Sequence, residues 1–549
     1  MKNSISIALA QHDSLVGGLQ GNAEKILQWV KRARDEFGAD IILFPELNLT
    51  GYPPEDLLLR HGFIEDTRKV LDELTGKIHG ITAIIGCPIL ESSSLYNSAV
   101  VIKDGVQVSR YDKQNLPNYS VFDEKRYFVA GDSPCIVETE AGKIGISICE
   151  DVWQDGPVEQ AVQAGAELIL NLNASPFHID KRDERFDAVS RQARQNSIPI
   201  AYVNMVGGQD ELVFDGGSFV VDQHGARQMH APVFEESLSL VEFTNTGDGL
   251  RPVASVMPAD LPLNESVYRA LVLGVRDYVT KNGFKGAVIG LSGGIDSALT
   301  LAVACDALGA ENVEAVLMPS RYTQSMSIED AIEQAENLGV HHRIIPIEKM
   351  FTAFLDGLQE TFASAPVDTT EENIQARCRG IILMAISNKQ GRIVLTTGNK
   401  SEMAVGYATL YGDMAGGYAV IKDVPKMLVY ELANWRNQQQ QVIPQRVIDR
   451  PPSAELADDQ KDEDSLPPYE ILDVILELYI EKNIGLEEIV ANGFDRDTVR
   501  KVIRLVDLNE YKRKQAAPGV RITKRAFGRD RRYPITSGYM HHVLSNDKS

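Results

Sequence analysis

The sequence predicts an α/β protein with two domains in tandem, a layered α/β domain followed by a doubly wound domain with a mostly parallel sheet. Three observations carry this prediction. The 549 residues exceed the roughly 100–200 residues of one domain. Strand-like and helix-like segments alternate in both halves of the chain. An aperiodic stretch with three prolines, residues 244–262, separates the halves.

The first half begins with a buried strand over residues 5–10, and apolar residues follow it at helical spacing from Ile26 to Phe37. Two hairpins are expected where turn-forming pairs interrupt alternating segments, one at Asp104-Gly105 and one near His224-Gly225. The other strands are expected at 41–46, 82–88, 143–151, 168–175 and 198–204. Buried strands with edge hairpins indicate a layered α/β domain over residues 1–243 and a linker over 244–264.

The second half, residues 265–549, begins a new α/β pattern. Helices are expected at 267–281 and 297–308, and strands at 287–291, 313–318, 343–347 and 392–397. Because parallel strands need a crossover connection, this alternation predicts a doubly wound, mostly parallel sheet. The acidic, proline-flanked residues 449–468 are expected to form a loop, and helices resume at Tyr469.

Composition excludes several classes of protein. Lys and Arg number 55 against 77 Asp and Glu, and the net charge of −22 argues against a nucleic-acid binder. Five scattered cysteines without a Cys-x-x-Cys pair exclude a disulfide scaffold, and no apolar run has the length of a signal peptide or a membrane span. These features predict a cytoplasmic protein that acts on small molecules, away from membranes and nucleic acids.

One segment departs from the acidic average. Residues 512–532 carry nine Lys or Arg and one acidic residue. Such a segment is a place where a ligand with phosphates could be met.

Three residues of the first half follow expected strands, where catalytic groups usually stand. Glu46 ends the strand 41–46, Lys113 follows the first hairpin, and Cys149 ends the apolar part of 143–151. A thiolate that attacks an amide needs a base, a cation for the developing oxyanion and a rigid mount, which fits Glu46, Lys113 and Cys149. The Lys113 ammonium is also expected to lower the pKa of the Cys149 thiol. On composition alone the alternative stands that Cys149 is a packed apolar residue and the two charges are unrelated.

The segments PELNLTGYPPEDLL, YDKQNLPNY and ICEDVW resemble, in this order, the three signature segments of the carbon–nitrogen hydrolase (nitrilase) superfamily. The resemblance implies an α-β-β-α sandwich and a Glu–Lys–Cys triad that matches Glu46, Lys113 and Cys149. It also implies a second glutamate in the site, and Glu124 is the match.

The same resemblance implies a glutamine-binding set. In glutamine-using members, the amino-acid end of the substrate is held at the positions that match Tyr119, Ser175 and Lys181. The alternatives are a packed aromatic side chain for Tyr119 and a solvated charge at a helix start for Lys181.

A glycine-rich turn between a strand and a helix, in AVIGLSGGIDSALTL, has the features of an anion cradle. Glycines let the backbone bend tightly and present N–H groups, hydroxyls add donors, and the helix N-terminus contributes its dipole. The turn matches neither G-x-x-x-x-G-K-[ST] nor G-x-G-x-x-G, and a tight turn without a ligand is the alternative. The cradle consists of Gly290, Leu291, Ser292, Gly293, Gly294, Ile295, Asp296 and Ser297.

Two carboxylates are candidate ligands for Mg²⁺. Asp296 lies in the cradle, and Glu402 follows the strand 392–397 in TTGNKSE. Ligands of parallel sheets bind at the carboxyl ends of strands, where both residues fall, and Mg²⁺ prefers carboxylate and phosphate oxygens. The alternatives are a helix cap for Asp296 and an ordinary first-turn glutamate for Glu402.

SGGIDS resembles the SGG-x-D-S pyrophosphate loop of ATP-dependent adenylating enzymes. Together with MPSRYTQSMSIEDA, ENIQARCRG, TTGNKSE and the Lys422-Asp423-Val424 turn, it makes the second half similar to NAD⁺ synthetase. Residues 4–539 as a whole resemble the glutamine-dependent NAD⁺ synthetases, in which the two domains are fused.

This resemblance implies that the cradle and Thr397 bind ATP, and that Asn373, Glu402 and Lys514 contact deamido-NAD⁺. It further implies Mg²⁺ as cofactor, ATP and deamido-NAD⁺ as substrates, an enclosed route for ammonia, and a homo-oligomer built on a synthetase-domain dimer. Capping groups and solvated charges are the alternatives for these contact residues. The alternative functions are another glutamine-fed adenylating amide ligase and a catalytically inactive nucleotide sensor.

Overall fold

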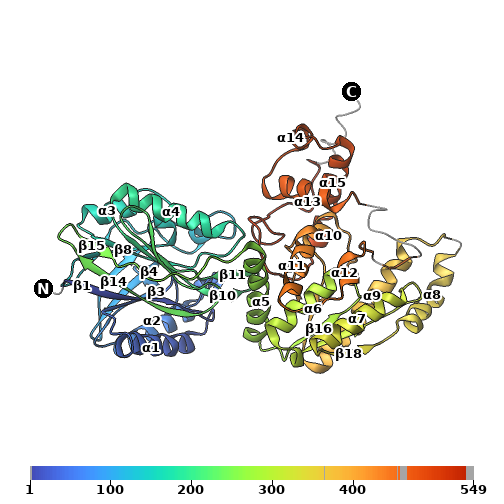
Figure 1. Cartoon of the computed structure of the whole chain (residues 1–549), viewed down its shortest axis with the longest axis horizontal. Helices are drawn as coiled ribbons and strands as arrows, with labels where there is room; N and C mark the ends of the chain where they lie inside the picture. The colour runs from blue at the N-terminus through green and yellow to red at the C-terminus, as the bar shows by residue number, and fades with distance from the viewer. Residues whose placement is uncertain (1–2, 364, 454, 458–465, 540–549) are drawn as a thin grey trace. The chain divides into compact units, whose positions relative to one another are not determined.

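The computed structural model describes residues 3–363, 365–453, 455–457 and 466–539. The chain forms two compact units, Met1–Leu261 and Pro262–Ser549 (Figure 1). Within the described ranges, no helix is both long and apolar enough to cross a membrane. Residues 454 and 458–465 of the acidic loop expected at 449–468 lie outside the described residues.

The first unit contains two large sheets. The orders are β15-β14-β1-β2-β3-β4-β5 in the seven-stranded sheet and β13-β12-β9-β8-β7-β6 in the six-stranded sheet. The first comprises β1 Ser4–Gln11, β2 Ile41–Leu43, β3 Thr82–Glu91, β4 Ser94–Lys103, β5 Val106–Asp112, β14 Ser237–Asn245 and β15 Leu250–Pro252. The second comprises β6 Cys135–Glu138, β7 Lys143–Ile148, β8 Leu168–Asn173, β9 Ile200–Asn204, β12 Phe219–Val221 and β13 Arg227–His230.

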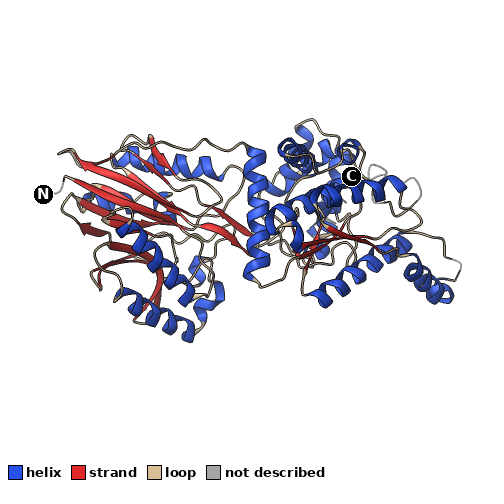
Figure 2. Cartoon of the chain, turned by 60° about the horizontal axis from the view of Figure 1, so that its bottom comes forward, coloured by secondary structure: helices blue, strands red, loops and turns tan. Residues whose placement is uncertain are grey.

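The two sheets of the first unit pack face to face, with helices on their outer faces (Figure 2). Ile7 and Leu9 of β1 share one core with Ile146 of β7, whereas Ala8 between them belongs to a second core with the helices. This alternation follows from the two-residue period of a strand. The outer helices are α1 Leu19–Asp35 and α2 His61–Thr75 on the first sheet, and α3 Pro157–Gln163 and α4 Lys181–Asn196 on the second. The predicted α-β-β-α sandwich is confirmed.

Both predicted hairpins are present. Asp104 (φ 48°) and Gly105 (φ 83°) make the left-handed turn between β4 and β5, and β12 pairs with β13 around the second turn. A third hairpin escaped prediction, β10 Val206–Gln209 with β11 Leu212–Asp215. Its first strand contains two glycines and a glutamine, which hide the apolar alternation.

The connection between the units begins later than the linker predicted at 244–264. β14 continues to Asn245 and pairs with β15, with Phe243 opposite Pro252. Glycines in the intervening turn, Gly247 and Gly249, make this hairpin look aperiodic in the sequence. Residues 253–262 have no regular secondary structure, and the following helix α5 Leu263–Lys281 starts four residues before its predicted beginning.

The second unit is built around a five-stranded sheet of order β18-β17-β16-β19-β20, in which every neighbouring pair is parallel. Its strands are β16 Ala287–Gly290, β17 Val313–Leu317, β18 His341–Ile344, β19 Ile393–Thr396 and β20 Tyr418–Ala419. The chain runs from β16 outward to β18 and then returns to β19 on the other side of β16. The predicted doubly wound sheet is therefore confirmed, with its switch point between β16 and β19, where such folds bind ligands.

Helices surround this sheet and form a further layer near the C-terminus. One core joins α8 and α9 to the sheet, and another joins α10 to α13, α14, α15 and Phe527. α13 continues into a π-helical turn, Glu477–Glu481. The helices after α5 are α6 Ile295–Leu308, α7 Ser325–Leu338, α8 Glu348–Phe362, α9 Thr369–Gln390, α10 Lys400–Val405, α11 Lys426–Gln439, α12 Gln445–Asp449, α13 Tyr469–Leu476, α14 Leu486–Ala491, α15 Arg496–Leu508 and α16 Glu510–Arg513.

Candidate active sites

Glu46, Lys113 and Cys149 meet at one end of the sandwich in the first unit. They follow strands β2, β5 and β7, and all three side chains are buried. Lys113 Nζ lies 2.7 Å from Glu46 Oε1, and both charges interact electrostatically with the Cys149 thiol. The structure therefore brings together the three residues that the sequence singled out.

A second carboxylate, Glu124, faces the same ammonium. Its Oε1 lies 2.9 Å from Lys113 Nζ and accepts a hydrogen bond from Tyr52 at 3.2 Å. Burial raises the pKa of Glu124 to about 7, against the opposing effect of Lys113. Among the described residues, Glu124 Oε2 has no hydrogen-bond partner although it is buried. An acceptor is thus available beside the thiol.

The Cys149 thiol differs electrostatically from the sequence-based expectation. Lys113 does lower its pKa, but burial and Glu46 outweigh that effect and raise the pKa of the thiol well above its ordinary value. The resting thiol is therefore protonated, and an attack needs a base to take the proton. Glu46 is placed for this, because its Oε1 and Oε2 are oriented by Asn97 at 2.7 Å and by the backbone N–H of Ala174 at 3.2 Å.

The backbone presents Cys149 in a strained conformation. Its φ of 45° lies in the left-handed region, which is costly for a residue with a side chain. Asp151 braces this turn, since it accepts hydrogen bonds from Ile148 N–H at 3.1 Å and Asn115 N–H at 2.8 Å. Its contact with Asn115 also joins the turn to the loop that carries Lys113.

Gly86 of β3 lets the Glu46 loop lie against the sheet. A Cβ at this position would lie 2.6 Å from the carbonyl oxygen of Pro45 and closer still to Leu47 N. We expect Gly86→Ala to cost about 1–3 kcal/mol of stability by overpacking and to slow amide hydrolysis by displacing Glu46. Thermal denaturation and the hydrolysis rate measure the two effects.

Gly21→Ala is the matched control, because a Cβ on Gly21 of α1 has nothing within 4 Å. Equal behaviour of the two variants would contradict the proposed close packing at Gly86.

Two of the three residues expected to bind glutamine lie near the thiol, and the third, Ser175, follows Ala174, whose N–H contacts Glu46. Tyr119 and Lys181 both interact electrostatically with Cys149. Ser175 is buried next to Ala174, and its Oγ accepts a hydrogen bond from Arg185 at 3.0 Å. Arg185 is itself buried and lies 2.7 Å from Asp215, so this ion pair holds the Ser175 side chain.

Sequence reasoning missed two neighbours of this set. Tyr119 donates a hydrogen bond to Glu150 at 2.9 Å, and Lys181 Nζ lies 4.0 Å from the centre of the Trp153 ring. Both residues belong to ICEDVW, directly after the nucleophile candidate. Their position in that segment was the available signal. Burial and Arg185 lower the pKa of Lys181 to about 8.

The second unit contains a cavity of about 790 Å³ at the switch point of its sheet. Of the residues expected to bind ATP, eight line it, as does Glu402; the eight are Gly290, Leu291, Ser292, Gly294, Ile295, Asp296, Ser297 and Thr397. The volume is within the range of small-molecule sites. The cavity thus unites loops that follow β16 and β19, as the switch-point rule requires.

Gly293 lies behind the wall of the cavity and shapes the cradle. Its φ is +82°, and a Cβ would overlap the carbonyl of Ser327, so only glycine fits this turn. Arg450, which the sequence did not indicate, donates to the Gly293 carbonyl at 2.6 Å and to Ser327 Oγ at 2.8 Å. The Ser292 and Ser297 hydroxyls lie 3.0 Å apart at the α6 N-terminus.

Asp296 and Glu402 converge on one cation, the Lys426 ammonium. Lys426 Nζ contacts Asp296 and lies 3.2 Å from Glu402 Oε1. Although burial opposes the charge, the two carboxylates raise the pKa of Lys426. Asn399, which caps α10, also donates to Asp296 at 2.8 Å. Asp296 and Glu402 thus offer two carboxylates, the type of ligand that Mg²⁺ prefers, beside the anion cradle, although no group of three or more His, Cys, Asp or Glu in the described part of the chain could hold a metal ion.

The remaining two candidates, Asn373 and Lys514, are not part of the cavity wall. Asn373 Oδ1 accepts a hydrogen bond from Thr409 at 2.7 Å, and Lys514 Nζ lies 3.7 Å from Glu510. Three of the nine cationic residues of the positive segment 512–532 are buried, and Lys514, Lys524 and Arg532 are exposed. Of the buried ones, Arg513 and Arg531 both contact Glu510.

Comparison with known proteins matches both halves. The carbon–nitrogen hydrolase family matches residues 6–248, and the NAD synthase family matches residues 267–516. The glutamine-dependent NAD(+) synthetase of Xylella fastidiosa is 49% identical over 543 residues, which cover 98% of this chain and 100% of that protein. The glutamine-dependent NAD(+) synthetase of Thermotoga maritima is 47% identical in an alignment of 574 positions. That alignment covers 97% of this chain and 99% of the Thermotoga protein.

Solved structures agree with these sequence matches. Glutamine-dependent NAD⁺ synthetase from Acinetobacter baumannii, solved in complex with ADP, is 47% identical with a TM-score of 0.79, covering 98% of this chain and 99% of its own. The synthetase from Cytophaga hutchinsonii shares the fold at 22% identity, with a TM-score of 0.86 and full coverage of both chains (100%).

Proposed function

The chain belongs to the glutamine-dependent NAD⁺ synthetases, and from that premise we propose how its residues divide the reaction between two sites. It is an ATP-dependent carbon–nitrogen ligase with glutamine as amide donor. It hydrolyses glutamine to glutamate and ammonia, and amidates deamido-NAD⁺ to NAD⁺ through an adenylate while ATP becomes AMP and diphosphate. We assign hydrolysis to residues 1–243 and ligation to residues 265–549.

In the first half-reaction, Cys149 Sγ attacks the side-chain amide of glutamine while Glu46 takes the thiol proton. Lys113 donates to the tetrahedral oxyanion, and Glu46 returns the proton to the departing ammonia. Water, activated by Glu46, then hydrolyses the γ-glutamyl thioester. Glu124 Oε2, for which the described part of the chain supplies no hydrogen-bond partner, is suited to accept a hydrogen bond from the amide nitrogen.

The amino-acid end of glutamine is assigned to Tyr119, Ser175 and Lys181, with the Lys181 ammonium on the α-carboxylate. The proximity of Tyr119 and Lys181 to the thiol supports this assignment. Glu150, which holds the Tyr119 hydroxyl, is a suitable partner for the substrate ammonium.

Glutamine binding should weaken as the pH rises past the pKa of Lys181, about 8. The protonated form binds the carboxylate, so between pH 7 and pH 9 the KM for glutamine hydrolysis should rise about tenfold from this group. Lys181→Arg, whose guanidinium stays charged, should remove the rise. The ratio of the two KM values cancels the titration of glutamine itself. A ratio that stays constant over this interval would contradict the role of Lys181.

In the second half-reaction, the deamido-NAD⁺ carboxylate attacks the α-phosphate of ATP. The cradle Gly290–Ser297 and Thr397 are assigned to ATP, with the backbone N–H groups and hydroxyls on the departing diphosphate. Asp296 and Glu402 would hold Mg²⁺, which would neutralise phosphate charge. Ammonia then attacks the adenylate carbonyl, which releases AMP and leaves NAD⁺.

Asn373, Glu402 and Lys514 are assigned to deamido-NAD⁺. Asn373 and Lys514 lie off the cavity wall. We further propose a homo-oligomer built on a dimer of the second unit, which sedimentation of the full chain tests. A cytoplasmic location, where ATP and glutamine are abundant, completes the proposal.

The observation that carries the proposal is the pairing of two complete sets of groups in one chain. One is the buried Glu46–Lys113 pair beside Cys149, and the other is the cradle with its two carboxylates. The test is formation of NAD⁺ from deamido-NAD⁺, ATP and glutamine with Mg²⁺ present. Absence of product would reject the function, whereas amidation of a different carboxylate would favour the alternative ligase.

A further inference from the structure

Lys400, the first residue of α10, is a buried lysine in the same short helix as Glu402, which lines the ligase cavity. Its side chain is 3% exposed, and its backbone N–H donates to Val424 at 2.9 Å. Its neighbour Asn399 donates to Asp296, and Glu402 lies one half-turn further along the helix. A displacement of Lys400 would therefore also move Asn399 and Glu402, which belong to the same helix turn.

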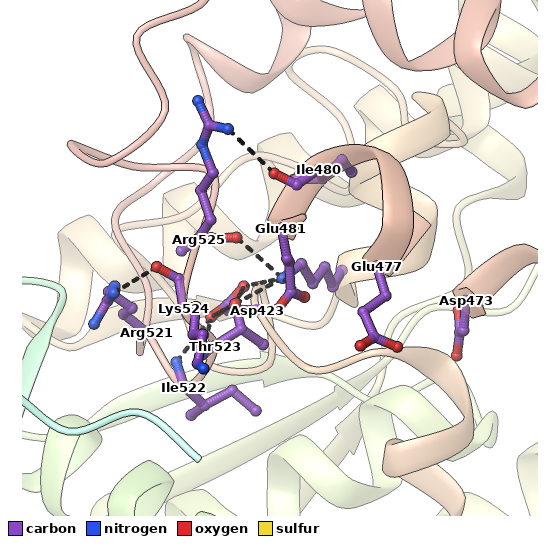
Figure 3. A network of polar contacts seen from close by, with 12 residues as sticks. Asp423, Asp473, Glu477, Ile480, Glu481, Arg521, Ile522, Thr523, Lys524 and Arg525 are labelled. Atoms are coloured by element: carbon purple, nitrogen blue, oxygen red, sulfur yellow. Dashed lines mark hydrogen bonds and ion pairs between the residues drawn. The ribbon is translucent and has the colours of Figure 1, made fainter. Parts of the chain in front are cut away.

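The Lys400 ammonium joins three separate parts of the second unit. It lies 2.9 Å from Asp423 and 2.7 Å from Glu481 of the π-helical turn. It also donates to Thr523 Oγ1 at 2.7 Å and to the Arg525 carbonyl at 3.2 Å. Figure 3 shows Asp423, Glu481 and Thr523 converging on one point. We call residues 516–531 the C-terminal segment.

The C-terminal segment forms part of the cavity wall. Ala516 and Ala517 line the cavity, and the next residues lie against the end of β20. The Ala419 N–H donates to the Pro518 carbonyl at 2.8 Å, and a Cβ on Gly519 would overlap the Ala419 carbonyl. The segment thus packs on the sheet edge too closely to admit a larger residue at 519.

Asp423 and Lys400 hold this segment by hydrogen bonds. Asp423 Oδ2 accepts hydrogen bonds from the N–H groups of Ile522 and Thr523, both at 2.8 Å. Although burial opposes the charge, Asp423 and Glu481 raise the pKa of Lys400. Removal of the ammonium would leave two buried carboxylates facing each other, which is strongly unfavourable. Lys400 therefore contributes to the docking of the segment, together with Lys422, whose Nζ donates to the Ala517 carbonyl at 2.8 Å.

The chemistry of ligation explains why this segment should stay docked. An acyl adenylate reacts with water as well as with ammonia, and water is in large excess, so the site must exclude it. We propose that the C-terminal segment is a water barrier of the ligase cavity and that Lys400 is the positioning residue that keeps it closed. This rests on the assignment of ligation to that cavity.

An open barrier produces a defined side reaction. A water oxygen attacks the adenylate carbonyl carbon, the bond from that carbon to the AMP oxygen breaks, and a proton passes to solvent. Deamido-NAD⁺ is regenerated, and ATP is converted to AMP and diphosphate without formation of NAD⁺. The ratio of AMP to NAD⁺ therefore reports on the barrier, and a general loss of structure would not raise it.

The experiment compares full-length wild type, Lys400→Met and Lys482→Met with ammonia as nitrogen source. Lys482 is the matched control, because it directly follows the same π-helical turn and is exposed. Its Nζ lies 2.7 Å from Glu477 Oε1. We expect an AMP to NAD⁺ ratio of about one in wild type and control, and a rise of about threefold or more in Lys400→Met. Hydrogen exchange of residues 516–531 should accelerate in Lys400→Met alone.

A ratio that stays at one in Lys400→Met while turnover falls would overturn the proposal, as would unchanged hydrogen exchange of the segment. If this variant does not fold, Thr523→Val carries the same test with the same two outcomes, since it removes a contact of the segment and keeps both charges of the Lys400–Asp423 pair. A wild type that makes no NAD⁺ from ammonia would reject the proposed function instead.

Discussion

Replacement of Cys149 by alanine should abolish glutamine-dependent NAD⁺ synthesis and leave ammonia-dependent synthesis near the wild-type rate. The thiol sulfur is the atom that would form the bond to glutamine, and no neighbouring group replaces it, so we expect a loss of about 10³-fold or more. Exogenous ammonia bypasses this step, because the ligase groups belong to the other unit. Steady-state rates with each nitrogen source, in one preparation, provide the measurement.

Cys87→Ala is the matched control for this substitution. Cys87 is also fully buried in the first unit, and burial raises its pKa to about 12. Its truncation also removes one buried sulfur atom, but it leaves Glu46 and Lys113 untouched. Both glutamine-dependent and ammonia-dependent synthesis should therefore persist. If Cys149→Ala lost the ammonia route as completely as the glutamine route, the division into two sites would be wrong.

Most of the fold was predictable because both halves alternate elements with clear periods. Strand β1 carries its apolar residues on both faces, and the hairpin at Asp104-Gly105 has the residues that a left-handed turn demands. The β10–β11 and β14–β15 hairpins were missed where glycines interrupt the alternation. Pattern reasoning fails there because it detects side chains, and these strands are specified by backbone pairing.

The positions of the candidate catalytic groups were predictable from strand ends. Glu46, Lys113 and Cys149 each follow a strand of one sandwich, and loops at one end of a sandwich meet in space. The charge state of the thiol was not predictable, because it depends on how deeply the site is buried. Sequence shows that a lysine is available, but only the structure shows that burial and Glu46 outweigh it.

Long-range partners were equally inaccessible to sequence. Lys426 is 130 residues from Asp296, and Arg450 is 157 residues from Gly293. No spacing rule connects such residues, since the sheet topology alone brings them together. The positive segment 512–532 illustrates the converse, because a count of charges cannot separate arginines that face a ligand from those that neutralise Glu510 inside the protein.

Asp296→Asn should stop NAD⁺ synthesis with either nitrogen source while glutamine hydrolysis continues at least in part. The substitution keeps the shape of the side chain but removes one of the two carboxylates that face Lys426. Glu402 would then be the one carboxylate left to hold Mg²⁺ beside the phosphates. We therefore expect a loss of about 10²-fold or more in ligation. Parallel assays of NAD⁺ and of glutamate formation separate the two half-reactions.

Asp306→Asn provides the contrast within the same helix. Asp306 also belongs to α6 and pairs with Arg436 at 2.6 Å, but it is not part of the cavity wall. Loss of that pair should alter stability modestly and leave both assays close to wild type. If Asp296→Asn ligated as fast as Asp306→Asn, the carboxylate would serve only to hold Lys426 and Asn399, and the metal-binding role assigned to it would have to pass to other groups. If it abolished glutamate formation as completely as ligation, the effect would lie in communication between the units rather than in the cradle.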